Sequence, residues 1–198
     1  MTVSVVVPIR SFDGLTRLAR VLDDEARTAL MLRLAEHTVR AIRSAGLHAV
    51  VVSSDSAVTA WGATHAQQVV PEPPVGGLDA AALAGVSAAP GPWMVVHADL
   101  PALTVGDIVA AAQLADRTTV IAPSRDGGTS LIGSNGDPQP FRYGPGSFRR
   151  HLSATRGHAT ILVRRGLALD LDRPWDLAAL HRLGYLSGEP AETEPRDL

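Results

Sequence analysis

Short, continuous apolar runs alternate along the chain with longer segments in which apolar residues recur every three or four positions. The runs are typical of strands buried on both faces of a sheet, and the longer segments are typical of helices that pack through one side. The runs predict strands at residues 3–7, 48–53, 67–70, 93–96 and 118–123. The periodic segments predict helices at residues 27–45, 56–61, 78–86, 104–114, 148–155 and 174–183. Strands separated by helices of this length indicate right-handed crossovers and an α/β fold with a mainly parallel sheet.

The pattern is less regular after residue 123. Residues 127–132 and 141–143 flank a stretch rich in turn-forming residues, which predicts an irregular hairpin. The apolar run 167–172 is interpreted as a further strand. No repeat or linker divides the chain, so we expect one domain over residues 1–186, followed by a disordered acidic tail at 187–198.

Composition narrows the possible classes of protein. A chain of 198 residues that is 45% hydrophobic is long enough for one well-buried domain. The net charge of -2 gives no general attraction to nucleic acid or to an anionic membrane. No apolar run is long enough to span a bilayer, and the N-terminal run lacks the flanks of a secretory signal, so we expect a cytoplasmic protein. Because the chain has no cysteine, any metal must be held by oxygen or imidazole ligands.

Carboxylates follow two of the predicted strands. Asp99 comes just after the run 93–96, and Asp170 and Asp172 end the run 167–172. Ligands of open α/β sheets bind outside the carboxyl ends of the strands, so these side chains could converge on one divalent cation, for which oxygen ligands favour Mg²⁺. The alternatives are that Asp99 only caps a turn, and that one of Asp170 and Asp172 only caps the following helix.

Three glycine-rich turns offer sites where a backbone can approach an anion. They are Gly76-Gly77, Gly127-Gly128-Thr129 and Gly144-Pro145-Gly146-Ser147, and the last opens a helix whose N-terminus favours phosphate. Arginines that could bind phosphate or carboxylate are Arg17, Arg142, Arg149 and Arg150. Each signal also has a structural interpretation, since glycine pairs are usually plain turns and arginines on a short helix usually face solvent. His97 could equally be a packed histidine, and His151 could face either substrate or solvent.

The ordered motifs resemble one family. Among them are Val7-Pro8-Ile9-Arg10, Gly77-Leu78-Asp79, Ala98-Asp99-Leu100-Pro101, Gly127-Gly128-Thr129, Gly146-Ser147-Phe148 with His151, and Asp170-Leu171-Asp172. They resemble the 2-phospho-L-lactate and phosphoenolpyruvate guanylyltransferases of coenzyme F-420 biosynthesis. The most specific element is the Gly-Gly-Thr motif followed, eighteen residues on, by Gly-Ser-Phe-x-x-His. The resemblance implies a three-layer sandwich of the nucleotide-diphospho-sugar transferase, or glycosyltransferase-A-like, fold.

The resemblance also implies an activity, the transfer of GMP from GTP to the phosphate of phosphoenolpyruvate or 2-phospholactate, with release of pyrophosphate. It implies that Asp99 and Arg17 are catalytic and that Mg²⁺ is held by Asp99 with Asp170 or Asp172. The phosphorylated three-carbon acid would be bound by Gly128, Thr129, Gly144, Ser147 and His151. The nucleotide would be bound by Pro8, Arg10, Arg17, Ser53, Leu78 and Asp79.

Several positions depart from the family pattern. The family usually has lysine where this chain has Arg10 and Leu15. It usually has asparagine in place of Asp79 and Ser130, and threonine in place of Arg173. Phosphoenolpyruvate is the preferred acceptor only by association, because the 18 basic residues are all arginine and this composition is typical of an actinobacterial genome.

Two other functions remain as alternatives. One is a related nucleotidyltransferase with a different phosphorylated acceptor, and the other is a weakly active homologue that binds nucleotide or a partner enzyme. Neither nucleic acid nor membrane is expected as a partner. A homodimer and a complex with the downstream transferase of the same pathway are left open.

Overall fold

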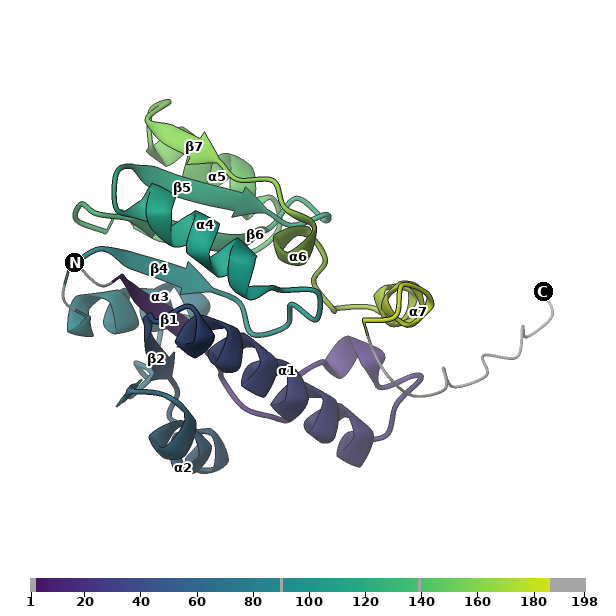
Figure 1. The fold of residues 1–198 in the computed structure, drawn as a ribbon. Coiled ribbons are helices and arrows are strands. Elements are labelled where there is room, and N and C mark those ends of the chain that lie inside the picture. The colour runs from purple at the N-terminus through teal and green to yellow at the C-terminus, as the bar shows by residue number, and fades with distance from the viewer. Residues whose placement is uncertain (1–2, 90, 139, 186–198) are drawn as a thin grey trace.

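A computed structural model describes residues 3–89, 91–138 and 140–185. Its sheet has seven strands in the order β3-β2-β1-β4-β6-β5-β7 (Figure 1). The strands are β1 (Ser4–Pro8), β2 (His48–Val52), β3 (Gln68–Val70), β4 (Trp93–Val96), β5 (Thr119–Pro123), β6 (Thr129–Ser134) and β7 (Ala159–Ile161). All pairings are parallel except those of β6, which is antiparallel to both β4 and β5. The prediction of a mainly parallel sheet is therefore confirmed.

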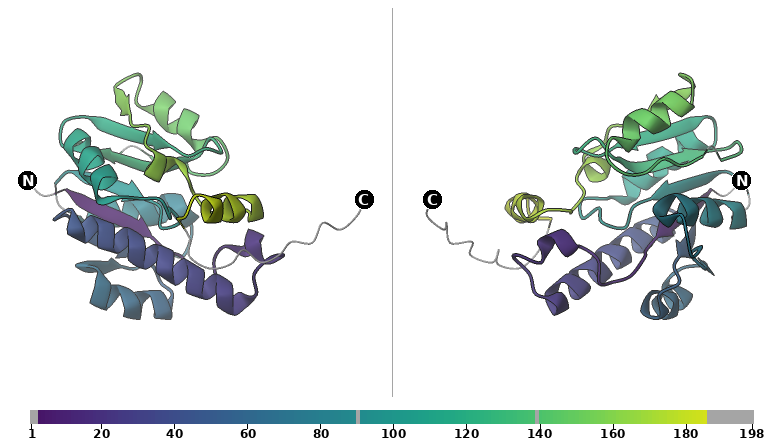
Figure 2. Two further views of the ribbon diagram at one scale, coloured as in Figure 1. Left: turned by 45° about the vertical axis from the view of Figure 1, so that its right-hand side comes forward. Right: turned by 180° about the vertical axis from the view of Figure 1, so that it is seen from behind.

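Helices cover both faces of the sheet, as Figures 1 and 2 show. On one face lie α1 (Asp24–Ser44), α2 (Ser56–His65), α4 (Val105–Ala115) and the short α6 (Arg165–Ala168), which bury side chains such as Ile42 and Ile108 against the strands. On the other face lie α3 (Gly77–Ala88) and α5 (Ser147–Ala154), which pack with Phe141. The three-layer sandwich is thus confirmed, and the continuous apolar runs follow from burial on both sides.

Besides the apolar clusters on the two faces of the sheet, a third apolar cluster lies beside the sheet. It joins the 3₁₀-helix η1 (Thr16–Leu18), the start of α1 and α7 (Pro174–Arg182), and its buried members are Leu18, Leu30, Leu34, Leu171, Leu177 and Leu180. α1 begins at Asp24, three residues before the predicted start, because the side chain of Asp23 accepts a hydrogen bond from the Ala26 N–H at 2.8 Å. This cluster fixes residues 169–173 against the rest of the molecule.

The predicted hairpin between residues 127–132 and 141–143 is wrong. Residues 141–143 form no strand, and β6 instead pairs with β5 across the turn that contains Gly127 and Gly128. The carboxylate of Asp126 closes that turn by accepting the Gly128 N–H at 2.8 Å, and Gly127 adopts φ 86°. Every residue of β6 is buried, since the strand is inserted into the interior of the sheet.

The prediction of a strand at residues 167–172 is also wrong. α6 ends at Ala168, and residues 169–173 form no strand. The alternation of Leu169 and Leu171 with aspartates reflects packing in the third cluster, where Leu171 is fully buried and Leu169 partly so. Asp170 and Asp172 therefore lie on a loop.

Two further predictions concern the chain as a whole. The tail at 187–198 lies outside the described residues. Within residues 3–89, 91–138 and 140–185, no helix is long and apolar enough to cross a bilayer.

Gly85 tests how closely α3 packs on the sheet. A Cβ at Gly85 would lie 2.3 Å from Val6 Cγ1 and 2.7 Å from Val52 Cγ2, and both side chains are buried. We expect Gly85→Ala to lower the free energy of unfolding by about 1–3 kcal/mol in urea titrations, because the core is overpacked. The matched control is Gly106→Ala in α4, where the nearest atom is 3.7 Å away and helix propensity predicts no loss. Equal stabilities of the two variants would contradict this packing.

Candidate active site

Three predicted carboxylates lie at the carboxyl end of β4. Asp99 follows β4 directly, and the loop that carries Asp170 and Asp172 is tied to it by a hydrogen bond of 2.9 Å from the Leu171 N–H to the Asp99 carbonyl. A second backbone hydrogen bond, from the Arg125 N–H to the Ala168 carbonyl at 3.0 Å, holds the end of α6 against the β5–β6 turn. Residues 99 and 170 are thus brought together although residues 167–172 form no strand.

The electrostatics of this region reflect crowded carboxylates. Burial raises the pKa of Asp99 to about 6, and the charges of Asp172 and Asp126 add to this effect. Burial likewise raises the pKa of Asp170 to about 6, with further contributions from Asp99 and Asp126. Asp99 Oδ1 is buried and accepts no hydrogen bond from the described residues. Burial and the neighbouring charges disfavour the ionised forms of Asp99 and Asp170, and a bound cation would stabilise those ionised forms.

Asp126 belongs to this group, and sequence reasoning missed it. Burial opposes ionisation of Asp126, but hydrogen bonds from the Ser124 hydroxyl and the Gly128 N–H outweigh burial and lower its pKa. The Ser-x-Asp-Gly-Gly segment carries the signal, because an aspartate two residues before a glycine often closes a turn with its carboxylate. The negative charge of Asp126 acts on both Asp99 and Asp170.

The donor set suits a hard divalent cation, although the predicted three ligands do not surround a single point. Within the part of the chain that the structure describes, no three acidic or histidine side chains are gathered closely enough to hold a metal ion. Asp172 instead forms an ion pair with Arg17 and lies 3.7 Å from the Arg173 guanidinium. Among the described residues, no arginine forms an ion pair with Asp99 or Asp170. The buried, unpartnered oxygen of Asp99 beside Asp170 therefore fits Mg²⁺ or Mn²⁺.

The predicted acceptor residues form one hydrogen-bonded group. Ser147 lies at the first position of α5, and its hydroxyl donates to Thr129 Oγ1 at 3.2 Å. His151 Nε2 accepts the Arg142 N–H at 2.8 Å, so a neutral ring carries its proton on Nδ1, which lies 2.9 Å from Thr129 Oγ1. Burial lowers the pKa of His151 to about 4, which favours the neutral ring. In this arrangement the Thr129 hydroxyl accepts two hydrogen bonds and donates none to a described residue, although Thr129 is only 1% exposed.

His151 and the predicted Gly144 contact this group, whereas the predicted Gly128 belongs to the β5–β6 turn. His151 is only 2% exposed and both ring nitrogens have protein partners, so it positions Thr129. Gly144 and Gly146 have φ of 104° and 69°, which side chains rarely adopt, and the Gly144 carbonyl accepts the Ser147 N–H. The Gly128 N–H is occupied by Asp126. The Arg150 guanidinium donates to the carbonyls of residues 142, 143 and 145, which fixes this loop.

The predicted nucleotide residues lie at or after the ends of β1 and β2, in η1 and in the first turn of α3. Arg10 is exposed and Pro8 ends β1. Ser53 is fully buried, and its hydroxyl donates to the Arg10 carbonyl at 3.4 Å. Ser53 therefore holds the loop that follows β1 in position. Leu78 is partly exposed in the first turn of α3. Leu15, where the family has lysine, adopts a left-handed φ of 55° and packs against the core.

Asp79 connects the two sides of the site. It lies in the first turn of α3, and its Oδ1 accepts the Tyr143 N–H at 2.7 Å. The Asp79 carboxylate therefore fixes the loop that contains Tyr143 to the first turn of α3. Sequence reasoning placed Asp79 near the nucleotide and did not find this contact, because residues 79 and 143 are far apart along the chain.

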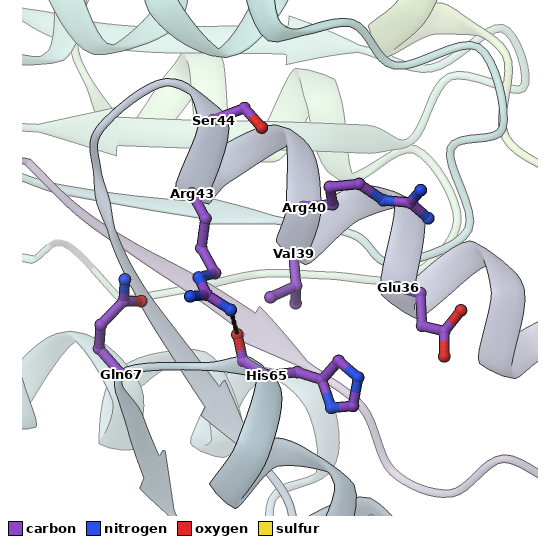
Figure 3. Close-up of a pocket in the computed structure, with 7 residues that line it drawn as sticks. All are labelled: Glu36, Val39, Arg40, Arg43, Ser44, His65 and Gln67. Atoms are coloured by element: carbon purple, nitrogen blue, oxygen red, sulfur yellow. Dashed lines mark hydrogen bonds between the residues drawn. The ribbon is translucent and has the colours of Figure 1, made fainter.

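A groove of about 690 Å³ lies away from these residues, between α1 and α2. Figure 3 shows its lining, which includes Arg40, Arg43 and His65, and the hydrogen bond from Arg43 to the His65 carbonyl. The groove adjoins the last turns of α1, which precede the amino end of β2. It is therefore remote from the carboxyl edge of the sheet that carries the candidate site.

Solved structures show which fold the chain shares. A nucleotidyl transferase from Methanothermobacter matches with a TM-score of 0.66 and 18% identity, covering 93% of this chain and 97% of that chain. The Rv0371c protein of Mycobacterium tuberculosis, in complex with manganese, matches with a TM-score of 0.59 and 17% identity, covering 91% and 98%. The fold is that of the nucleotidyltransferases.

Sequence comparison identifies the family. Residues 3–184 match the family model described as "Guanylyl transferase CofC like", and the chain belongs to this family of guanylyltransferases. A phosphoenolpyruvate guanylyltransferase of Rubrobacter xylanophilus is 35% identical, covering 96% of this chain and 98% of the relative. A 3-phospho-D-glycerate guanylyltransferase of Phenylobacterium zucineum is 36% identical, covering 84% of each. The protein is thus a nucleotidyltransferase.

Asp99→Asn tests the electrostatic account. The pKa of Asp99 is about 6 in the folded protein and about 3.9 in an unfolded chain, so the folded state binds more protons between these values. Wild-type stability therefore falls as the pH rises through this window. In urea titrations with chelator, we expect the free energy of unfolding of Asp99→Asn to exceed that of the wild type by about 1–3 kcal/mol at pH 7. Near pH 4 we expect the two free energies to be equal.

The control for this prediction is Asp137→Asn, which neutralises an exposed carboxylate. The free energy of unfolding of Asp137→Asn should not rise relative to that of the wild type between pH 4 and pH 7. An Asp99→Asn protein that is no more stable than the wild type at pH 7 would contradict the account.

Proposed function

We propose that the protein transfers GMP from GTP to the phosphate of a phosphorylated three-carbon acid, with phosphoenolpyruvate as the first candidate, in coenzyme F-420 biosynthesis. The observation that carries the proposal is the arrangement of Asp99 and Asp170 near the start of β6, where the Thr129 hydroxyl is hydrogen-bonded to Ser147 at the start of α5. In this proposal GTP binds at the ends of β1 and β2, and the acid binds at the group formed by Thr129, Ser147 and His151. Cytoplasmic location, where GTP is available, is part of this proposal.

The chemistry requires two anions to meet. An oxygen of the acceptor phosphate forms a bond to the α-phosphorus of GTP, and the bond to the leaving pyrophosphate breaks. Because the second pKa of a phosphate monoester is about 6, the acceptor is already ionised at neutral pH and needs no general base. The task left to the protein is to orient both substrates and to offset their repulsion.

The chain's own residues divide this task. Asp99 and Asp170 would hold a divalent cation, preferably Mg²⁺, and such an ion supplies positive charge to the reacting phosphates. Thr129 donates a hydrogen bond to the acceptor, held in position by Ser147 and His151. Arg10 and Arg17 face the triphosphate. The side chain of Arg17 is 63% exposed, so it can exchange Asp172 for a phosphate, which releases Asp172 toward the cation.

A second acceptor, 3-phospho-D-glycerate, is favoured by one observation. The relative named for that substrate is 36% identical over 84% of this chain, and the relative named for phosphoenolpyruvate is 35% identical over 96%. Both acids carry a phosphate and a carboxylate, so both satisfy the same chemical requirements.

Pyrophosphate release tests the proposal. The purified protein is incubated with GTP and Mg²⁺ and with phosphoenolpyruvate, 2-phospholactate or 3-phosphoglycerate in turn. We expect release with GTP and phosphoenolpyruvate, none without an acceptor, and at least a thousand-fold loss in Asp99→Asn, because a cation ligand is removed (roughly 4 kcal/mol of barrier). Asp137→Asn should be as active as the wild type. The proposal fails if none of the three acids supports release, and faster release from ATP or CTP would contradict the assignment of GTP.

A further inference from the structure

Two buried polar atoms beside the carboxylates have no hydrogen-bond partner. They are the hydroxyl oxygen of Tyr143 and Nε2 of His97. The described residues contain five such side-chain atoms, and a third, Asp99 Oδ1, lies in the same region. The remaining two, on Arg27 and Trp61, belong to α1 and α2. A buried polar group without a partner costs free energy, so three of them together indicate that a ligand completes this region.

The Tyr143 ring is held firmly. It stacks on Phe141 with centroids 5.9 Å apart and an interplanar angle of 12°, and it meets the edge of His151 at 5.0 Å. Its backbone N–H donates to Asp79 at 2.7 Å, and its carbonyl accepts from Arg150 at 3.0 Å. These contacts fix the position of the hydroxyl before any ligand binds, which is the preorganisation that selective recognition needs.

Tyr143 lies between the two halves of the site. On one side it contacts the ring of His97, at a centroid distance of 5.2 Å, and His97 Nδ1 lies 4.0 Å from Asp99 Oδ1. On the other side it contacts His151, which is bonded to Thr129. A molecule whose phosphate reaches the carboxylates and whose other end reaches Thr129 must therefore pass Tyr143.

We infer that the Tyr143 hydroxyl donates a hydrogen bond to an oxygen of the phosphorylated acid, beside His97 Nε2, and so helps to select the acceptor. The inference rests on the proposed function. Packing alone does not account for the hydroxyl, because phenylalanine would make the same ring contacts and bury no polar atom. The oxygen has three possible sources in this class of ligand: a phosphate oxygen, a carboxylate oxygen or a free hydroxyl.

Tyr143→Phe tests the inference, because it removes one oxygen and keeps the ring. We expect the KM of the acceptor to rise roughly ten-fold with the KM of GTP changed less than two-fold, as for the loss of one hydrogen bond to a charged group. The thermal midpoint of the ligand-free variant should equal or exceed that of the wild type, since no protein group loses a partner. A lower midpoint with an unchanged acceptor KM would show a structural role and overturn the inference.

The chain offers a matched control in its other tyrosine. Tyr185 lies under the Arg165 guanidinium at 5.4 Å, a contact that Tyr185→Phe retains, and this variant should leave both KM values unchanged. Ser147→Ala provides a reference for a weakened acceptor site. A rise in the KM of phosphoenolpyruvate assigns the contact to a carboxylate or phosphate oxygen, because that acid has no hydroxyl. A rise with 3-phosphoglycerate alone assigns it to the hydroxyl.

Binding without turnover separates this inference from the proposed function. The shift in thermal midpoint is measured for wild type and Tyr143→Phe with each acid and Mg²⁺ in the absence of GTP. A wild-type shift that Tyr143→Phe reduces supports the contact even if pyrophosphate is not released. Turnover by the wild type with equal acceptor KM and equal shifts in Tyr143→Phe refutes the contact and leaves the proposed function standing. No shift and no turnover with any acid refutes both.

Discussion

A backbone hydrogen bond from the Leu171 N–H to the Asp99 carbonyl ties the loop that carries Asp170 and Asp172 to the segment that follows β4. The two residues are distant in sequence, and the loop at 169–173 has no strand pairing to define its position. Burial of Leu171 among the leucines of η1, α1 and α7 supplies the free energy that keeps the loop in place. The arrangement of the candidate site thus depends on an apolar cluster outside the main sheet.

Bringing carboxylates together in this way destabilises the protein in the absence of a counter-charge. Arginines neutralise Asp172, whereas Asp99 and Asp170 keep a pKa of about 6 because they are buried near one another and near Asp126. Such strain is typical of functional sites, where a ligand supplies the missing interaction. The acceptor side follows a different rule, since Thr129, Ser147 and His151 satisfy one another and leave a single hydroxyl proton free.

The sequence predicted the regular part of the fold well and the site only in part. Strands buried on both faces are continuous apolar runs, and helices that pack through one side repeat apolar residues every three or four positions. The parallel core of the sheet and its helical layers could therefore be predicted from the pattern. The pattern could not distinguish Leu169 and Leu171 in a packed loop from the same alternation in a strand, and it could not show that β6 would insert between β4 and β5. Asp126, the Asp79–Tyr143 contact and the supporting role of His151 depend on tertiary contacts that no local signal specifies.

The most direct test of the central claim is the binding of Mn²⁺, followed by electron paramagnetic resonance, to the wild type, Asp170→Asn and Asp137→Asn. If Asp99 and Asp170 hold one cation, Asp170→Asn should bind Mn²⁺ at least ten-fold more weakly than the wild type, and Asp137→Asn should bind it equally well. Equal affinity of the wild type and Asp170→Asn would contradict the claim that the loop bonded to Asp99 completes a metal site.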